Sequence, residues 1–140
     1  MSVTPGTAIP PWAMSDIDPS RMKTMAAILR DPYPVHWDRD AVAALGLGDR
    51  VINQGPLNLS YITNMLIAWQ GPTCIRRLQV SFGRPVLDHD HVIATGTVTS
   101  IEIVDGEHRA TCDVRLEREA RPVVTGTAVV AFDPSEPEDH

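Results

Sequence analysis

Hydrophobic residues recur at helical spacing in the first half of the chain. Asp18 and Pro19 form a typical helix start, an N-cap followed by a proline at the first helical position. Apolar side chains then repeat three or four residues apart, at Met22, Met25, Ala26 and Leu29. The helix is expected to end by about Arg30, because the next residue precedes a proline and is pushed out of helical conformation.

Two further helices are expected before residue 70. The first is short, with Asp38 as its cap and Gly46 as a typical C-terminal glycine. The second begins at Gly55-Pro56 and is apolar on nearly every side, through Leu57, Leu59, Tyr61, Ile62, Met65, Leu66, Ala68 and Trp69. A helix of this kind is expected inside the molecule, wrapped by other elements.

After the long helix, the pattern changes to a period of two, which predicts strands. Apolar and polar residues alternate over residues 78–82, and residues 91–104 are rich in valine, isoleucine and threonine. Asp105-Gly106 is a strong hairpin signal before residues 108–119, and residues 123–132 form a last strand. About four antiparallel strands after a long apolar helix predict an α+β fold, in which a curved sheet wraps the helix.

The two ends of the chain differ from the part between them. Residues 1–15 are rich in proline and small residues and are expected to form an extended arm or an irregular surface strand. Residues 16–132 are expected to form one folded domain, since no internal repeat divides them. Residues 133–140 carry four carboxylates and are expected to be a disordered acidic tail.

Charge and composition narrow the function classes. The net charge of the chain is -6, but most of it comes from the acidic tail. Residues 1–132 carry 12 basic and 14 acidic groups, which is a net charge of -2. This nearly neutral body argues against nucleic-acid binding, and no apolar run approaches the roughly 20 residues that cross a bilayer. Cys74 and Cys112 cannot build a disulfide framework, and the first residues lack the basic region of a signal peptide. The expected location is therefore the cytoplasm.

Asp31 and His36 are the most informative polar pair. A carboxylate and an imidazole can share acid–base work, and Pro32 and Pro34 stiffen the segment between them. A fully extended step of this length spans about 17 Å, so the two side chains meet only if the chain bends. On spacing alone, Asp31 as a turn residue and His36 as a structural histidine stays an open alternative.

The surrounding residues resemble a known family. The run Arg30-Asp31-Pro32-Tyr33-Pro34-Val35-His36, with Ile52-Asn53-Gln54-Gly55 opening an apolar helix, resembles the hydratase motif of MaoC-like hotdog-fold enoyl-CoA hydratases. The segment Phe82-Gly83-Arg84-Pro85-Val86 is similar to that family as well, and the resemblance covers about residues 16–132. It implies a single hotdog fold. Within the family, the chain is most similar to the small, single-hotdog subunit of the actinobacterial hydratase of steroid side-chain enoyl-CoA thioesters.

The resemblance implies a hydro-lyase that adds water to a trans-2-enoyl-CoA. Asp31 and His36 would be the acid–base pair, and the backbone of Gly55 would stabilise the thioester oxygen as an oxyanion donor. Gln54 and Thr63 would bind substrate. Two structural alternatives stay open: a Thr63 hydroxyl that bonds only to the backbone of its own helix, and a Gly55 that is only a flexible helix start. No metal or redox cofactor is implied, because coenzyme A belongs to the substrate.

The family pattern is not matched at every position. Arg30 stands where the family usually has glycine, Tyr33 replaces its asparagine, and Gln54 replaces its histidine. These differences leave the acid–base pair intact but alter the expected pocket shape. The segment Asp88-His89-Asp90-His91 contains metal-ligand residue types, but no third cluster completes a site.

Two other functions and the pairing of chains stay open. A hotdog thioesterase generally uses a carboxylate on the central helix, and residues 56–70 contain none. A non-catalytic hotdog subunit would shape the acyl tunnel of a partner, which the intact Asp31 and His36 disfavour. The resemblance also implies a dimer, either of identical chains or with a second MaoC-like chain. The charge and hydropathy of the chain predict no nucleic-acid or membrane partner.

Overall fold

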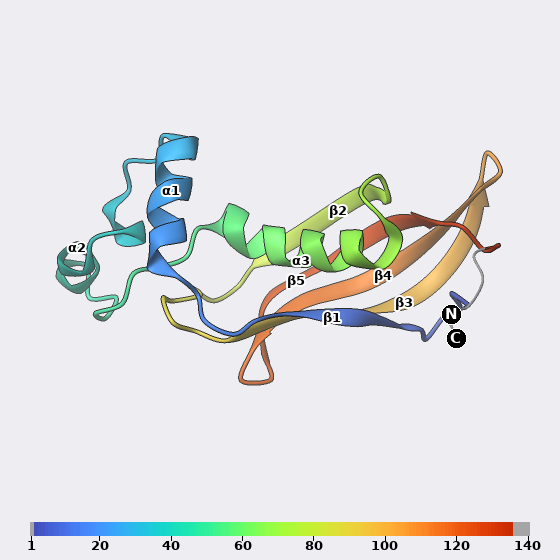
Figure 1. Ribbon diagram of the computed structural model, residues 1–140. Helices are drawn as coiled ribbons and strands as arrows, with labels where there is room; N and C mark the ends of the chain where they lie inside the picture. The colour runs from blue at the N-terminus through green and yellow to red at the C-terminus, as the bar shows by residue number, and fades with distance from the viewer. Residues whose placement is uncertain (1, 136–140) are drawn as a thin grey trace.

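A five-stranded antiparallel sheet and one long helix form the two main layers of the structure (Figure 1). The computed structural model describes residues 2–135. In chain order its elements are β1 Ala8–Met14, α1 Pro19–Leu29, the 3-10 turn η1 Pro34–His36, α2 Arg39–Ala44, α3 Gly55–Gln70, β2 Ile75–Phe82, β3 Val92–Val104, β4 Glu107–Arg118 and β5 Arg121–Phe132. The spatial order of the strands is β1-β3-β4-β5-β2. This arrangement confirms the predicted α+β fold with a curved antiparallel sheet.

Two tight hairpins join the three middle strands. Asp105 and Gly106, both with positive φ, connect β3 to β4 as predicted. Glu119 and Ala120 connect β4 to β5 with the same left-handed geometry, although neither is a typical residue for it. The second turn therefore depends on the pairing of its strands rather than on its own residues.

The N-terminal arm forms a strand of the sheet, which adds a fifth strand to the four expected after the long helix. β1 pairs with β3 along the edge, with Ala8 opposite Thr97 and Met14 opposite Val92. Its register shifts across Pro10 and Pro11, which cannot donate backbone hydrogen bonds. Two prolines are compatible with an edge strand because only one side of such a strand is paired. Of the predicted acidic tail, residues 136–140 lie outside the described residues.

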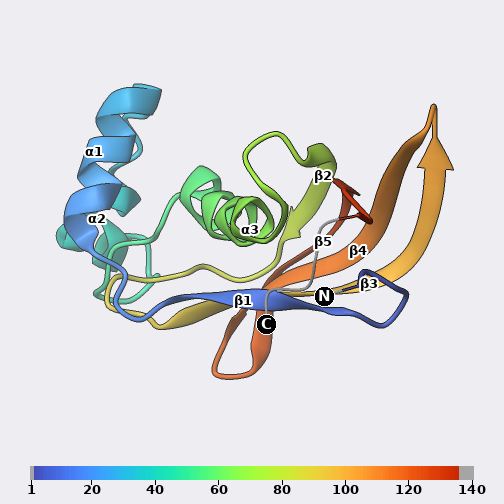
Figure 2. The same ribbon diagram turned by 45° about the vertical axis from the view of Figure 1, so that its right-hand side comes forward.

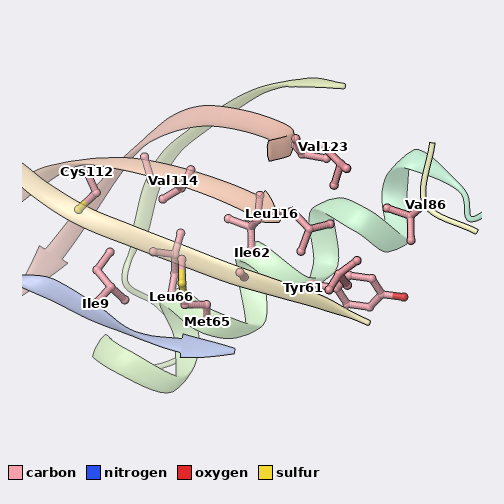
Figure 3. Close-up of a cluster of buried hydrophobic side chains, with 14 of the residues drawn as sticks. Ile9, Tyr61, Ile62, Met65, Leu66, Val86, Cys112, Val114, Leu116 and Val123 are labelled. Carbon is pink, nitrogen blue, oxygen red and sulfur yellow. The ribbon is translucent and has the colours of Figure 1, made fainter. Parts of the chain in front are cut away.

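Helix α3 lies in the concave face of the sheet, as the turned view shows (Figure 2). Tyr61, Ile62, Met65 and Leu66 of the helix are buried against strand residues that include Ile9, Cys112, Val114, Leu116 and Val123 (Figure 3). Gly96 admits this close approach, because a Cβ there would lie 2.8 Å from Ile9 and 3.4 Å from Met65. The predicted interior position of the apolar helix is confirmed.

The short helices stand apart from the sheet, beside the N-terminal end of α3 (Figure 1). They expose large apolar side chains that include Ile28, Leu29, Tyr33 and Trp37. None of the helices within residues 2–135 is long and apolar enough to cross a membrane.

Glu107 is expected to make the stability of the fold sensitive to acid. Hydrogen bonds from Arg76, and next from Arg109, lower the pKa of this carboxyl group from 4.5 to about 2. A lowered folded-state pKa stabilises the fold above pH 4.5, and this contribution is lost as the pH falls towards 2. Glu107→Gln should therefore be less stable than the unmodified protein at pH 7 and equally stable near pH 2. Urea unfolding across this range measures the difference, and a constant difference at every pH would contradict the assignment.

Candidate active site

The end of α1 places the carboxylate of Asp31. The backbone N–H of Arg30 bonds to the carbonyl of Ala27 (3.3 Å), and that of Asp31 bonds to the carbonyl of Ala26 (3.0 Å). These are the two bonds of a Schellman motif, with Arg30 in the left-handed region at φ 51° and ψ 39°. The carboxylate then accepts the N–H of Tyr33 at 3.0 Å. Asp31 is thus held at a defined point just beyond the helix.

The 3-10 turn η1 returns the chain so that His36 faces Asp31. His36 Nδ1 lies 2.7 Å from the carbonyl oxygen of Ile52, which also donates its own N–H to Val35 at 2.8 Å. The ring edge of Tyr33 packs on the imidazole, with 5.9 Å between ring centroids. The bend that the spacing of Asp31 and His36 required is therefore present.

The separation of the His36 and Asp31 side chains is suited to binding a water molecule between them. His36 Nε2 lies 3.5 Å from Asp31 Oδ2, and their side chains are 13% and 33% exposed. A carbonyl only accepts hydrogen bonds, so Nδ1 carries a proton, and the neutral tautomer with this proton has its lone pair at Nε2. Two acceptors at this separation can both receive hydrogen bonds from one water molecule, which positions that water for acid–base chemistry.

Gly55 lies at the start of α3 and lines the same pocket as His36. Its backbone N–H has no hydrogen-bond partner among residues 2–135, as expected for the first turn of a helix. The ring of Phe82 covers the glycine, since a Cβ there would lie 3.3 Å from it. The pocket is about 280 Å³ and is lined by His36, Ile52, Asn53, Gly55, Asn58, Phe82, Gly83, Arg84 and Pro85. An acid–base pair therefore adjoins a pocket with a free backbone donor at a helix N-terminus.

Gln54 and Thr63, the other two residues named from the sequence, lie outside this pocket lining. Gln54 is buried, and its amide nitrogen donates to the carbonyl of Met22 at 2.7 Å. This bond ties α1 to the start of α3. Thr63 donates to the carbonyl of Leu59 at 3.1 Å, within its own helix. The structure thus gives both residues contacts inside the protein. His36 and Gly55 line one pocket, and Asp31 lies outside that lining but reaches His36.

Two asparagines in the pocket wall were not singled out as site residues from the sequence. Asn53 Nδ2 donates to Asn58 Oδ1 at 2.8 Å and to the hydroxyl of Tyr61 at 3.1 Å. Burial raises the pKa of the Tyr61 phenol, so this group stays neutral. The signal available in the sequence was an amide, Asn58, in the first turn of a helix that is otherwise mostly apolar. It is a weak signal, because amides also cap and solvate helix ends.

The acidic segment after β2 is bound by arginines. Asp88 pairs with Arg39, while Asp90 accepts hydrogen bonds from Arg50 (3.2 Å) and Arg118 (2.8 Å). These carboxylates are therefore already neutralised by cations of the chain itself. In the described part of the chain, no cluster of three or more potential metal ligands occurs.

Known proteins share both sequence features and fold with this chain. Residues 3–120 match the family model described as MaoC like domain. No curated protein matches the chain.

Among solved structures, a chain of the ChsH1-ChsH2 complex from Mycobacterium tuberculosis is 24% identical with a TM-score of 0.78, covering 94% of this chain and 99% of that one. The (R)-hydratase of A. caviae involved in PHA biosynthesis is 26% identical with a TM-score of 0.79, covering 94% and 98%. R-hydratase PhaJ1 of Pseudomonas aeruginosa is 21% identical with a TM-score of 0.75, covering 99% and 92%. These structures have the same fold as this chain.

Replacing Arg30 by glycine is expected to stabilise the protein. A residue with a Cβ costs about 1 kcal/mol in the left-handed conformation that Arg30 adopts, and glycine avoids this cost. Arg30→Gly should therefore raise the free energy of unfolding by about 0.5 kcal/mol, as measured by chemical denaturation, because the greater freedom of glycine in the unfolded chain offsets part of the gain. Arg30→Ala is the matched control, because it removes the same guanidinium but keeps the Cβ. Equal stability of the two variants would contradict the strain argument.

Proposed function

Since this chain belongs to the MaoC-like hydratase/dehydratase family, we propose that it hydrates a trans-2-enoyl-CoA thioester, or dehydrates the 3-hydroxyacyl-CoA in the reverse direction. The observation that carries the proposal is the approach of His36 Nε2 to Asp31 Oδ2, at 3.5 Å beside the Gly55 pocket. The reaction needs one group to take a proton from water, one site to return a proton to carbon, and one donor for the thioester oxygen. This site offers all three.

Hydration begins with a water molecule held between Asp31 and His36. As its oxygen bonds to C3 of the enoyl group, the lone pair of His36 Nε2 takes a proton, and the adjacent carboxylate stabilises the imidazolium. The electron pair of the double bond moves towards the thioester carbonyl, whose oxygen gains negative charge. The acid–base pair then returns one proton to C2, so that it ends in its starting state.

The thioester oxygen needs a donor that is in place before the charge develops. The N–H of Gly55 is unpaired within the described residues, and the helix dipole of α3 adds positive potential at the same point. Such preorganised donors are each worth about 3–4 kcal/mol of transition-state stabilisation in acyl transfer enzymes. Gly55 also lacks a Cβ, which leaves room for the Phe82 ring, 3.3 Å from where a Cβ would lie, to form the adjacent wall of the pocket.

The acyl group is proposed to be bulky, such as a steroid side chain. This rests on the resemblance of the sequence to the small subunit of that hydratase class. The exposed aromatic rings of Tyr33 and Trp37, about half accessible, lie on the turn that carries His36 and are available to contact a large apolar group.

The two cysteines are free, which fits a reducing compartment, and we place the reaction in the cytoplasm.

The test is hydration by the purified chain of enoyl-CoA thioesters with acyl groups of increasing bulk. Loss of the absorbance of the conjugated thioester reports hydration, and a thiol reagent reports release of coenzyme A. Release of the thiol would identify a thioesterase instead, although α3 carries no carboxylate. No reaction with any acyl group, alone or with a partner chain, would indicate a non-catalytic subunit.

Loss of either member of the acid–base pair is expected to abolish hydration. Asp31→Asn and His36→Ala should lower kcat by about 10²–10⁴-fold, because the first removes the charge that stabilises the imidazolium and the second removes the group that takes the proton. Asp113→Asn and His91→Ala, at exposed positions outside the pocket, are the matched controls and should retain full activity. Near-normal turnover by a folded Asp31→Asn or His36→Ala protein would refute the assignment.

A second chain is proposed to complete the pocket. Ligand pockets usually enclose 300–1,000 Å³, whereas the pocket of this chain is about 280 Å³ and is open at Phe82, which is 55% exposed. We therefore expect a hotdog dimer, of identical chains or with a second MaoC-like chain. Light scattering with parallel activity assays, on the chain alone and co-purified with candidate MaoC-like partners, distinguishes the two. An active monomer would contradict this proposal.

A further inference from the structure

The orientation of His36 depends on one hydrogen bond to the backbone. Its Nδ1 donates to the carbonyl of Ile52 at 2.7 Å, and this bond decides which ring nitrogen keeps a lone pair. If the carbonyl moved away, the imidazole proton could move to Nε2, and the side facing Asp31 would become a donor. The position of the Ile52 carbonyl is therefore a requirement of the acid–base pair.

Residues 51–53 form backbone hydrogen bonds to two other segments, the turn at Val35 on one side and residues 86–88 on the other. On one side, the N–H of Ile52 bonds to Val35 at 2.8 Å. On the other side, the N–H of Asn53 bonds to the carbonyl of Val86 at 2.7 Å, and the N–H of Asp88 bonds to the carbonyl of Val51 at 3.0 Å. The segment that supports His36 is thus held between the turn that carries the histidine and residues 86–88.

One ion pair connects the two outer of these three segments directly, joining the start of α2, just after the histidine turn, to residues 86–88. Arg39, in the first turn of α2, reaches the carboxylate of Asp88, and Arg50 donates to the Asp88 carbonyl at 3.2 Å. The side chain of Asp88 is 0% exposed, and its Oδ1 has no hydrogen-bond partner among residues 2–135. Arg39 follows His36 by only three residues, so the ion pair holds the histidine segment against residues 86–88, which form an isolated β-bridge with Ile52.

A fully buried carboxylate is a costly way to stabilise a fold. Removing a charge from water costs several kcal/mol, and in this pair only Asp88 is removed from water, because the Arg39 side chain is 54% exposed. The best-attested use of such pairs is to select one arrangement of the groups around them. Here the arrangement selected is the register of residues 35–36, 51–53 and 86–88.

We propose that Arg39 and Asp88 are positioning residues for His36. Their ion pair holds the Ile52 carbonyl against Nδ1, and so keeps the imidazole in the tautomer whose Nε2 lone pair faces Asp31. Neither residue touches the substrate or the reacting water. The kinetic side of the proposal rests on the proposed hydratase function, whereas the tautomer itself is a property of the protein alone.

The decisive experiment is ¹⁵N NMR of the histidine rings in the full chain, since ring nitrogen shifts report the tautomer directly. The chain has five histidines, and His36→Ala identifies the signals of His36. The unmodified protein should show the proton on Nδ1. Asp88→Asn and Arg39→Gln should shift His36 to a mixture of tautomers, and Arg39→Lys should restore the original state, because a single donor–carboxylate contact is what must be kept.

Kinetics give the second readout. Asp88→Asn and Arg39→Gln should lower kcat by about 10- to 100-fold with little change in KM, and Arg39→Lys should recover most of it. Glu107→Gln is the matched control, because it breaks an exposed ion pair far from the site and should change neither readout. If Asp88→Asn does not fold, Arg39→Gln decides the question, since the Arg39 side chain is 54% exposed.

The proposal is overturned if folded Arg39→Gln or Asp88→Asn protein keeps the Nδ1 tautomer, whatever happens to its stability. It is also overturned if the tautomer changes while kcat does not. Absence of hydration by the unmodified chain would instead count against the proposed function, and the NMR result would still decide whether the ion pair orients His36.

Discussion

The packing of one apolar helix into the hollow of a curved sheet determines where every other part of this protein lies. Helix α3 buries Ile62, Met65 and Leu66 completely or nearly so, and only a sheet that bends around it can cover them. The N-terminal end of the helix then projects towards the short helices. Gln54, next to the start of α3, connects α3 to α1 by its hydrogen bond to the carbonyl of Met22. The geometry of the site depends on this packing, because Gly55 begins the buried helix and Asp31 lies just beyond the end of the helix that Gln54 contacts.

Local signals in the sequence were sufficient for the elements that depend on local chemistry. Asp18 caps α1 and Asp105-Gly106 turns β3 into β4, as their residue types indicate. The strand β1 was harder to predict, because Pro10 and Pro11 disfavour strands except at an edge, and edge position depends on the partner. The turn at Glu119-Ala120 contains no residue typical of turns, so the local sequence does not predict it.

The candidate site shows the same division between local and distant causes. Asp31 and His36 could be named from their residue types and from a family motif, but their approach requires a 3-10 turn and a carbonyl from Ile52. A family motif indicates which residues to examine but not their contacts, and the bonds of Gln54 to Met22 and of Thr63 to Leu59 could not be predicted from it. The arginines that neutralise Asp88 and Asp90 come from three distant parts of the chain, and no spacing rule brings them together.

The strand order also affects how this chain acquires its structure during synthesis. β1 pairs with β3, so Ala8 meets Thr97, and β2 pairs with β5, so Ile75 meets Val130. Such distant pairings form slowly, because long loops must close before any contact is gained. A ribosome therefore releases the apolar face of α3 long before the strands that cover it exist. Until β5 emerges, the nascent protein exposes the kind of surface that chaperones bind.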